Sequence, residues 1–137
     1  MKLAIMQPYF LPYIGYWQLM NYVDKFVVYD NIEYIKKGWI NRNRYLCCGT
    51  DKYFTLPLRK DSDYLNVIER ELSQEFKAEK IFRQMKGAYS NAPYWKNVKL
   101  ILDEVFDCNE SNLFYYILHS IKVIRKWLDI NSEIIIS

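Results

Sequence analysis

The fold of this chain is decided by residues 2–29, KLAIMQPYFLPYIGYWQLMNYVDKFVVY. The apolar run at 2–6 stops at Gln7, which precedes a proline that removes a backbone donor, so a buried strand that ends in a loop is predicted. Residues 16–23 place apolar side chains at helical spacing, which indicates a short helix with one apolar face. The run at 25–29 is β-branched and aromatic and predicts a second strand.

A strand, a helix and a strand in this order form a βαβ unit, which favours a parallel pair with a right-handed crossover. Ligands of open α/β sheets usually bind beside the carboxyl ends of the strands, because loops and helix N-termini converge there. The two loops at these ends, residues 7–15 and 30–44, are therefore expected to form the functional site. The segment from Gln7 to Arg44 is rich in polar and aromatic residues.

The remaining chain predicts mostly helices. A strand is expected at 52–58, and a mixed segment at 65–72 fits either a strand or a helix start. Apolar residues at helical spacing predict three helices, over 76–89, 94–106 and 111–129, and the closing apolar run predicts a buried strand at 133–136. The fold class is therefore α/β, with a Rossmann-like βαβ start and a mostly helical C-terminal half. An exposed end strand would allow a homodimer, since unpaired edges seek partners.

Composition limits the class of protein. The 137 residues suffice for one domain with its own core, so a single domain over 1–137 is expected. No apolar run approaches the roughly 20 residues that span a bilayer, and prolines interrupt the N-terminal apolar stretch, so neither a membrane span nor a signal peptide is expected. The three cysteines lack disulfide or metal spacing, which favours a reducing, cytoplasmic setting.

Charge and aromatic content point to the kind of ligand. The net charge of +3 is small for a nucleic-acid binder, so nucleic acid ranks low as a partner. Binding of a single strand by stacking on Trp39 beside basic residues remains a third-ranked alternative. Aromatic residues make up 18% of the chain. Their amphipathic rings suit planar or sugar-like ligands, although they also suit ordinary half-buried packing.

The first loop, QPYFLPYIGYW, contributes Gln7, Tyr13 and Gly15 as candidate ligand-binding residues. Two prolines fix its backbone, and Gly15 permits close backbone approach ahead of the helix. Such a loop can hold an anion at the helix N-terminus. The alternative is a rigid turn with aromatic packing.

The second loop contains the basic stretch IKKGWINRNR. Guanidinium and ammonium groups bind phosphate or carboxylate, asparagines recognise polar edges, and tryptophan stacks on a base or a sugar face. The candidate ligand-binding residues of this loop are Lys37, Trp39, Asn41, Arg42 and Asn43. The alternative is a merely solvated, charged loop.

Asp30 follows the second predicted strand and is the candidate catalytic acid or base. Asp24 fits a turn better. His119, the only histidine, falls on the polar face of its helix and is expected to be solvated, and Cys47 and Cys48 lack a neighbouring histidine that would activate them. No metal site is predicted, and no cofactor is specified.

At these two loops the chain resembles the WbqC-like family of bacterial proteins, often encoded among genes for surface polysaccharide (O-antigen) synthesis. The resemblance lies in an ordered series of residues spread over much of the chain. They are Gln7, Pro8, Pro12, Gly15, Tyr16, Asp24, Phe26, Val27, Asp30, Trp39, Asn41, Arg42, Asn43, Pro57, Tyr89, Pro93 and Tyr94.

This resemblance implies a cytoplasmic transferase or accessory biosynthetic protein that acts on a nucleotide-linked sugar or a related phosphate or carboxylate ligand. Members of the family are longer, so the chain is expected to be either a short homologue or the N-terminal part of the family domain, truncated at its C-terminus. The alternative is a non-catalytic binding or scaffold protein for a biosynthetic partner. A pocket in which Arg42 and Asn43 make structural hydrogen bonds would favour it.

A weaker similarity runs to the HxGH nucleotidyltransferases through Tyr13-Ile14-Gly15-Tyr16. Tyrosines replace both histidines of that motif, and a phenol with a pKa near 10 cannot supply the cationic phosphate contact of a protonated histidine. The similarity supports a Rossmann-like fold and does not support adenylyl transfer.

Overall fold

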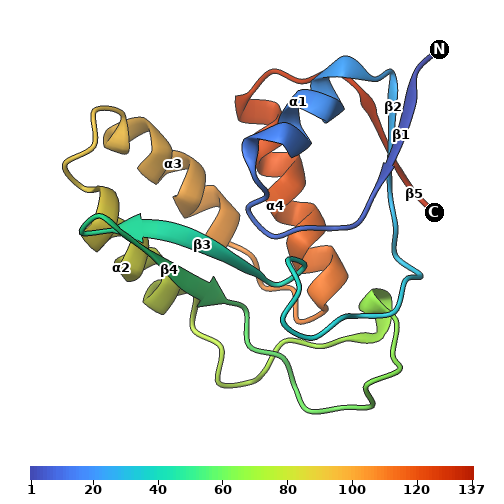
Figure 1. Ribbon diagram of the computed structural model, residues 1–137, viewed down its shortest axis with the longest axis horizontal. Helices are drawn as coiled ribbons and strands as arrows, with labels where there is room; N and C mark the ends of the chain where they lie inside the picture. The colour runs from blue at the N-terminus through green and yellow to red at the C-terminus, as the bar shows by residue number, and fades with distance from the viewer.

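A computed structural model describes residues 1–137 and shows a three-stranded parallel sheet at one end of the molecule (Figure 1). The strands β1 (Leu3–Met6), β2 (Lys25–Val28) and β5 (Glu133–Ile136) lie in the order β1-β2-β5. Helix α1 (Ile14–Tyr22) connects β1 to β2. The predicted α/β class and the parallel βαβ start are confirmed.

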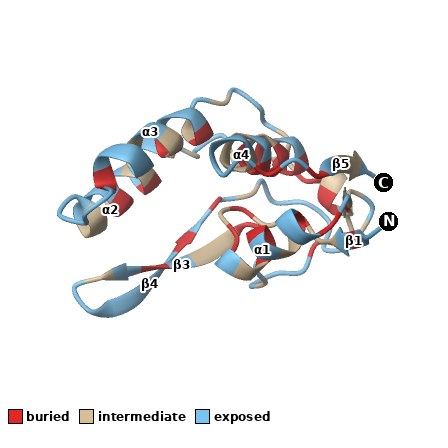
Figure 2. Ribbon diagram, turned by 90° about the horizontal axis from the view of Figure 1, so that it is seen from above, coloured by how far each residue is buried: buried red, intermediate tan, exposed pale blue.

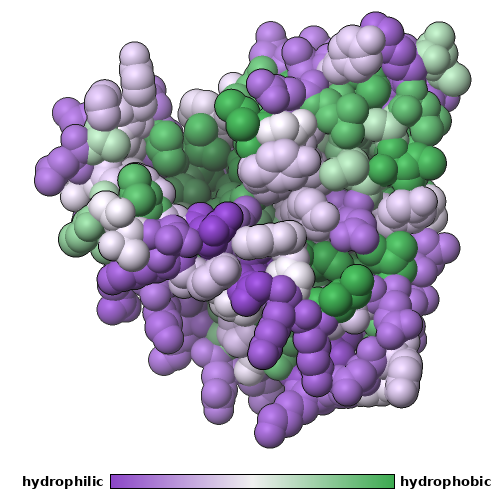
Figure 3. Space-filling model, viewed as in Figure 1, coloured by the Kyte–Doolittle hydropathy of each residue, from purple (hydrophilic) through white to green (hydrophobic).

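The two faces of this sheet differ in burial. Ala4 of β1 is in register with Phe26 of β2, and both side chains are buried. The ring of Phe26 packs 5.2 Å, between centroids, from Tyr16 of α1. Leu3 and Ile5 point to the opposite face and are exposed. Figures 1 and 2 show α1 and α4 on one side of the strands, and Figure 3 shows hydrophobic residues gathered at the surface near β1.

The predicted helices of the second half are present. Helix α2 spans Ala78–Tyr89, α3 spans Trp95–Phe106 and α4 spans Leu113–Trp127. Asn112 caps α4, because its side chain accepts a 3.1 Å hydrogen bond from the backbone N–H of Tyr115. Helix α4 carries the largest buried face of the molecule, and its fully buried side chains pack against the first loop and α1 in one core.

A β-hairpin replaces part of the predicted second loop. Strand β3 (Arg42–Cys47) pairs antiparallel with β4 (Thr50–Thr55), so residues 42–44 lie on a strand and the prediction of a loop through residue 44 is wrong. The turn between the strands has positive φ at Cys48 (53°) and Gly49 (78°), the geometry of a two-residue type I′ turn. The first three residues of β3 are polar or charged, so the sequence lacks the apolar alternation that predicts a strand.

Two other segments differ from expectation. The ambiguous stretch at 65–72 forms a single 3-10 turn, η1 (Val67–Glu69), fixed by a capping box between Asn66 and Glu69. Strand β5 is a half-buried edge strand, not a buried one, because it pairs with β2 on one side only. None of the helices combines the length and apolar character needed to cross a membrane.

Candidate functional site

The two loops that follow β1 and β2 meet directly. At the strand ends, the backbone N–H of Tyr29 donates a 3.1 Å hydrogen bond to the carbonyl of Met6. Further along, the N–H of Phe10 donates a 2.9 Å hydrogen bond to the carbonyl of Ile40. Phe10 is fully buried, so the first loop is anchored in the core where it meets the second.

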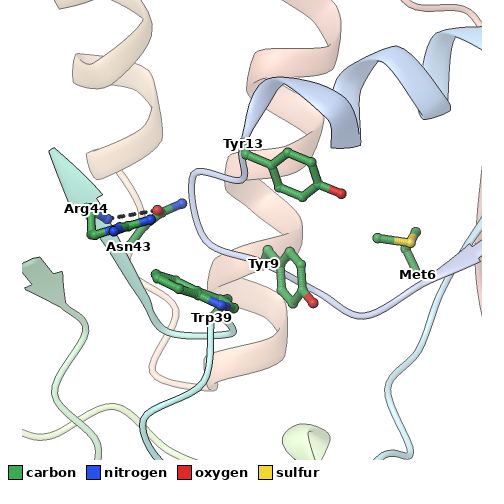
Figure 4. A pocket seen from close by; sticks show the side chains of 6 residues that line it. All are labelled: Met6, Tyr9, Tyr13, Trp39, Asn43 and Arg44. Atoms are coloured by element: carbon green, nitrogen blue, oxygen red, sulfur yellow. Dashed lines mark hydrogen bonds between the residues drawn. The ribbon is translucent and has the colours of Figure 1, made fainter.

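A cleft of about 270 Å³ opens between these loops. The first loop and the end of β1 contribute one side, and the second loop and β3 contribute the other (Figure 4). The lining side chains are Met6, Tyr9, Tyr13, Trp39, Asn43 and Arg44. Tyr13 is 61% exposed and Trp39 is 41% exposed, so both rings offer free surface to a ligand. Three of the six lining side chains are aromatic, and one is charged.

Asn43 fastens the first loop to β3. Its Nδ2 donates a 2.6 Å hydrogen bond to the carbonyl of Leu11, and its Oδ1 accepts a 2.8 Å hydrogen bond from the N–H of Arg44. Leu11 has a φ of 49°, a left-handed conformation that costs energy for a residue with a branched side chain. A side chain of the hairpin thus stabilises an unfavourable backbone conformation beside the cleft.

Arg42 fastens the second loop in the same way. Its guanidinium donates a hydrogen bond to the carbonyl of Lys37, which has a φ of 59°. The Cζ of Arg42 also lies 4.6 Å from the ring centroid of Tyr53 and 5.6 Å from that of Trp39. These cation–π contacts orient the Trp39 ring, and the rings of Trp39 and Tyr53 stack with centroids 6.3 Å apart.

Asn41 makes a third fastening, inside the core. The residue is 5% exposed, its Oδ1 accepts a 2.8 Å hydrogen bond from the hydroxyl of Tyr34, and its Nδ2 donates a 2.9 Å hydrogen bond to the carbonyl of Leu56. Three consecutive residues, 41–43, therefore place their side chains in hydrogen bonds that connect separate segments of the chain.

Arg44 is the cation of the cleft. Its Cζ lies 5.4 Å from the Trp39 ring centroid, and its Nη1 lies 3.3 Å from a carboxylate oxygen of Asp51. Both partners of this ion pair are about half exposed, so the pair is worth little to stability and the guanidinium can turn toward an anion. Lys36 is engaged elsewhere, 2.7 Å from Asp63.

Tyr9 supplies a neutral hydroxyl to the cleft. Burial raises the pKa of its phenol above the ordinary value, and the neighbouring Tyr13 raises it further. The ring packs 5.7 Å from that of Tyr16, between centroids. At physiological pH the Tyr9 hydroxyl is therefore protonated and can both donate and accept hydrogen bonds.

Comparison with known proteins identifies the family. The model of the WbqC-like protein family matches residues 7–137, which is nearly the whole chain. The chain belongs to the WbqC-like protein family. An uncharacterized protein of Mycobacterium tuberculosis, Rv1507c, is 30% identical over 98 residues, which cover 71% of this chain. The chain spans 42% of the length of that relative. No solved structure matches this chain.

The cleft of this WbqC-like protein unites three of the nine predicted site residues. Tyr13, Trp39 and Asn43 line it, whereas the other six lie outside its lining. Arg42 and Asn41 are held by the contacts described above, and Lys37 is exposed at the strained turn. Whether any of the nine binds a ligand stays a prediction.

The remaining predicted residues have identifiable surroundings. The main-chain carbonyl of Gln7 accepts a 2.9 Å hydrogen bond from the Tyr16 hydroxyl. A Cβ at Gly15 would lie 2.4 Å from Cε2 of Tyr13, so this glycine leaves room for the Tyr13 ring over the start of α1. The carbonyl of Asp30 accepts a 3.1 Å hydrogen bond from the N–H of Ile68.

Sequence reasoning missed Met6, Tyr9 and Arg44 as lining residues. Met6 belongs to the first predicted strand, and as the last residue of β1 it reaches the carboxyl end of the sheet. Arg44 belongs to the predicted second loop, whereas the structure places it on β3. Alternation along β3 would have separated Arg44 from Tyr45, whose side chain is buried on the opposite face.

Other reactive side chains of this WbqC-like protein lie outside the cleft lining. Nε2 of His119 lies 2.9 Å from the carbonyl of Glu104, and the residue is half-buried rather than fully solvated. Cys47 and Cys48 sit at the hairpin turn with their Sγ atoms 4.0 Å apart. No group of three or more histidine, cysteine, aspartate or glutamate side chains is arranged to hold a metal ion.

Proposed function

We propose that this WbqC-like protein binds a nucleotide-linked sugar, or a related ligand with a phosphate or carboxylate group, in the cleft between the two loops. In this proposal it acts in the cytoplasm as a transferase or an accessory protein of surface polysaccharide (O-antigen) synthesis. The observation that carries the proposal is the combination of the Tyr13 and Trp39 rings with the Arg44 guanidinium around one cleft.

The chemistry of these side chains suits such a ligand. An aromatic ring packs against the face of a base or a sugar, because both surfaces are flat and partly apolar. A guanidinium binds phosphate or carboxylate through paired hydrogen bonds. The half-exposed ion pair between Arg44 and Asp51 can open at small cost, which leaves the guanidinium available to the ligand.

The catalytic assignment remains part of the proposal. Asp30 follows β2 and would act as the acid or base of a transfer reaction, and Lys37 would approach an anionic group from the rim. Asn43 would orient the ligand with whatever hydrogen-bonding capacity its bonds to Leu11 and Arg44 leave.

One observation favours the alternative of a non-catalytic binding or scaffold protein. Arg42 and Asn43 are engaged in structural hydrogen bonds, and the side chains that line the cleft include no carboxylate, histidine or thiol. In this version the aromatic cleft holds a ligand or a partner's side chain without transforming it.

A thermal-shift screen tests ligand binding. UDP-sugars, dTDP-sugars, free nucleotides and acyl donors are added to the folded chain, and a ligand that binds only the folded state raises its melting temperature. We expect nucleotide-sugars to raise it, and we expect Trp39→Ala and Arg44→Gln each to weaken the affinity on the order of tenfold. Arg83→Gln, an exposed arginine on α2 outside the cleft, is the matched control.

The outcomes separate the two versions. A nucleotide-sugar response that survives both cleft variants would place the ligand elsewhere and contradict the proposal. Binding without turnover, in the presence of an acceptor sugar, would favour the scaffold. If binding and turnover both occur and Asp30→Asn removes only the turnover, the transferase version is supported.

We also propose that two copies of the chain associate through an open edge of the parallel sheet. β1 and β5 each pair with β2 only, so each has one unpaired edge. Sedimentation equilibrium tests this directly, and a monomer at all concentrations would refute it.

A further inference from the structure

The hairpin strands alternate between backbone groups that pair with each other and groups that point outward. The N–H of Leu56 donates to the carbonyl of Asn41, so the pairs formed by odd residues of β3 are hydrogen-bonded. The backbone N–H and C=O groups of the even-numbered residues of β3 therefore point away from β4. The backbone groups of the residues opposite them on β4 likewise point away from β3. By register, Tyr53 lies opposite Arg44 and Thr55 lies opposite Arg42.

The two outer edges of this hairpin are treated differently. On β3, the N–H of Leu46 donates a 2.8 Å hydrogen bond to the hydroxyl of Tyr89 from α2, and the N–H of Arg44 donates to the Asn43 side chain. On β4, the outward N–H groups of Tyr53 and Thr55 make no hydrogen bond, and no third strand pairs with them. Proteins normally cover such edges, so one open edge beside one covered edge is a distinguishing feature.

A groove of about 430 Å³ lies beside the open edge. One wall is β4 and the other is the start of α2, and Tyr53 and Thr55 are among the lining residues. The lining residues that matter most are the buried Phe54 and Ile81, which supply apolar surface.

The helix side of this groove is basic. Lys77 and Lys80 are exposed there, and neither takes part in any ion pair. Glu75 is the only acidic side chain of the lining. An occupant with acidic side chains would complement this wall.

We propose that the β4–α2 groove is a docking site for an extended, acidic peptide segment of a partner protein, which adds to β4 as a third strand. The backbone of the segment would pair with the outward groups of Tyr53 and Thr55, and its acidic side chains would face Lys77 and Lys80. Strand addition next to a helix uses main-chain hydrogen bonds for affinity and side-chain contacts for selectivity.

This site is separate from the aromatic cleft but shares a neighbour with it. Tyr53 is one of the residues that line the groove, and its ring stacks on Trp39, which lines the cleft. The docking proposal does not depend on any ligand of the cleft, since it rests on the strand edge and the lysines alone.

The test is an amide NMR titration of the full chain with the acidic peptide acetyl-EVEVEVE-amide. We expect the largest shifts and the strongest protection from hydrogen exchange at the backbone amides of Tyr53 and Thr55. The basic peptide acetyl-KVKVKVK-amide keeps the alternating apolar pattern, and its affinity should be lower than that of the acidic peptide by about tenfold or by a larger factor.

Two sets of variants separate the edge from the charges. Thr55→Pro deletes one outward N–H without removing a hydrogen bond between β3 and β4, and proline is tolerated at such edge positions. It should weaken acidic-peptide binding by about threefold to tenfold, whereas Thr55→Val, which keeps the N–H, should not. Lys77 and Lys80 are both exposed, so a double variant with Lys77→Glu and Lys80→Glu should keep the fold. This double variant should lose the preference for the acidic peptide.

Three outcomes would overturn the proposal. They are the absence of shifts at Tyr53 and Thr55 at millimolar acidic peptide, equal binding of the acidic and basic peptides, and equal affinities of Thr55→Pro and Thr55→Val. If Thr55→Pro fails to fold, the doubly substituted lysine variant still decides, because retained selectivity for the acidic peptide in it contradicts the assigned role of the helix wall.

Discussion

Asn43 Nδ2 lies 2.6 Å from the carbonyl oxygen of Leu11, a residue 32 positions earlier in the chain. This hydrogen bond joins the hairpin to the first loop at the point where φ of Leu11 is positive. It therefore sets the position of the Tyr9 and Tyr13 rings relative to Trp39, which comes from the other side of the cleft.

Removing this hydrogen bond should loosen the first loop. We expect Asn43→Ala to lower the free energy of unfolding by about 1–2 kcal/mol, since a partly buried carbonyl loses its donor. Urea denaturation measures the change, and hydrogen exchange should accelerate in residues 7–13. Asn97→Ala, an exposed asparagine of α3, is the control and should change stability by less than about 0.5 kcal/mol. Equal effects of the two variants would refute the role of the Leu11 contact.

The two helical glycines offer a matched pair. Gly15→Ala places a Cβ 2.4 Å from the Tyr13 ring, which must swing away, so cleft binding should weaken while the fold survives. At Gly87 a Cβ meets nothing within 4 Å, so Gly87→Ala should raise stability by about 0.5–1 kcal/mol and leave binding unchanged. Melting temperatures with and without a nucleotide-sugar measure both effects. Unchanged ligand affinity in Gly15→Ala would remove the Tyr13 ring from the binding surface.

Two buried tyrosines should respond oppositely to loss of their hydroxyl. Tyr16 donates a hydrogen bond to the carbonyl of Gln7, so Tyr16→Phe should cost about 0.5–1.5 kcal/mol. The hydroxyl of Tyr116 is buried without a partner, so Tyr116→Phe should be neutral or stabilise by about 1 kcal/mol. Denaturant unfolding of both variants gives the comparison. A large loss in Tyr116→Phe would mean that this hydroxyl has a partner.

These tyrosines also predict a pH dependence. Burial raises the pKa of Tyr16 and of Tyr116 far above the ordinary value near 10. The unfolded chain loses these protons above about pH 10 while the folded chain keeps them, so the stability is fully present below that pH and falls as the pH rises further. Tyr16→Phe removes one such group and should show a shallower decline of unfolding free energy in alkaline buffer than the native chain. Parallel curves would contradict the assignment.

The hairpin turn can be improved. Cys48 has a positive φ that asparagine tolerates better, and Cys48→Asn creates the Asn-Gly pair that type I′ turns favour. We expect a gain of about 0.5 kcal/mol, whereas the β-branched Cys48→Val should destabilise by about 1 kcal/mol or more. Thermal denaturation in reducing buffer orders the three chains. If Cys48→Val proves as stable as the native chain, the turn adopts another geometry in solution.

The parallel sheet and the helices could be predicted because their patterns are local. The apolar run before Gln7 and the β-branched run ending at Tyr29 each fill one strand, and the stripe on residues 16–23 fits one helix face. Strand β3 could not, because four of its six residues are charged or polar or lie at the turn, and its formation depends on pairing with β4.

The meeting of the two loops could be predicted from the sequence, but the residues that line the cleft between them could not all be predicted. Both loops converge as their place after parallel strands requires. The stretch from Asn41 to Asn43 has the composition of a ligand site, yet its side chains form hydrogen bonds with Tyr34, Lys37 and Leu11 within the protein. Sequence alone could not distinguish these uses, because the partners of an amide or a guanidinium depend on segments that meet only after folding.

The strand order β1-β2-β5 carries a consequence for biosynthesis. β2 receives one neighbour from the first residues of the chain and the other more than 100 positions later, at Glu133–Ile136. While the ribosome is still making α4, one side of β2 therefore has no strand to pair with, and closing so long a loop is entropically costly. Until residues 133–136 have left the ribosome, the backbone groups on that side of residues 25–28 have no strand partner, and the three-stranded sheet can be completed only after synthesis of the last helix.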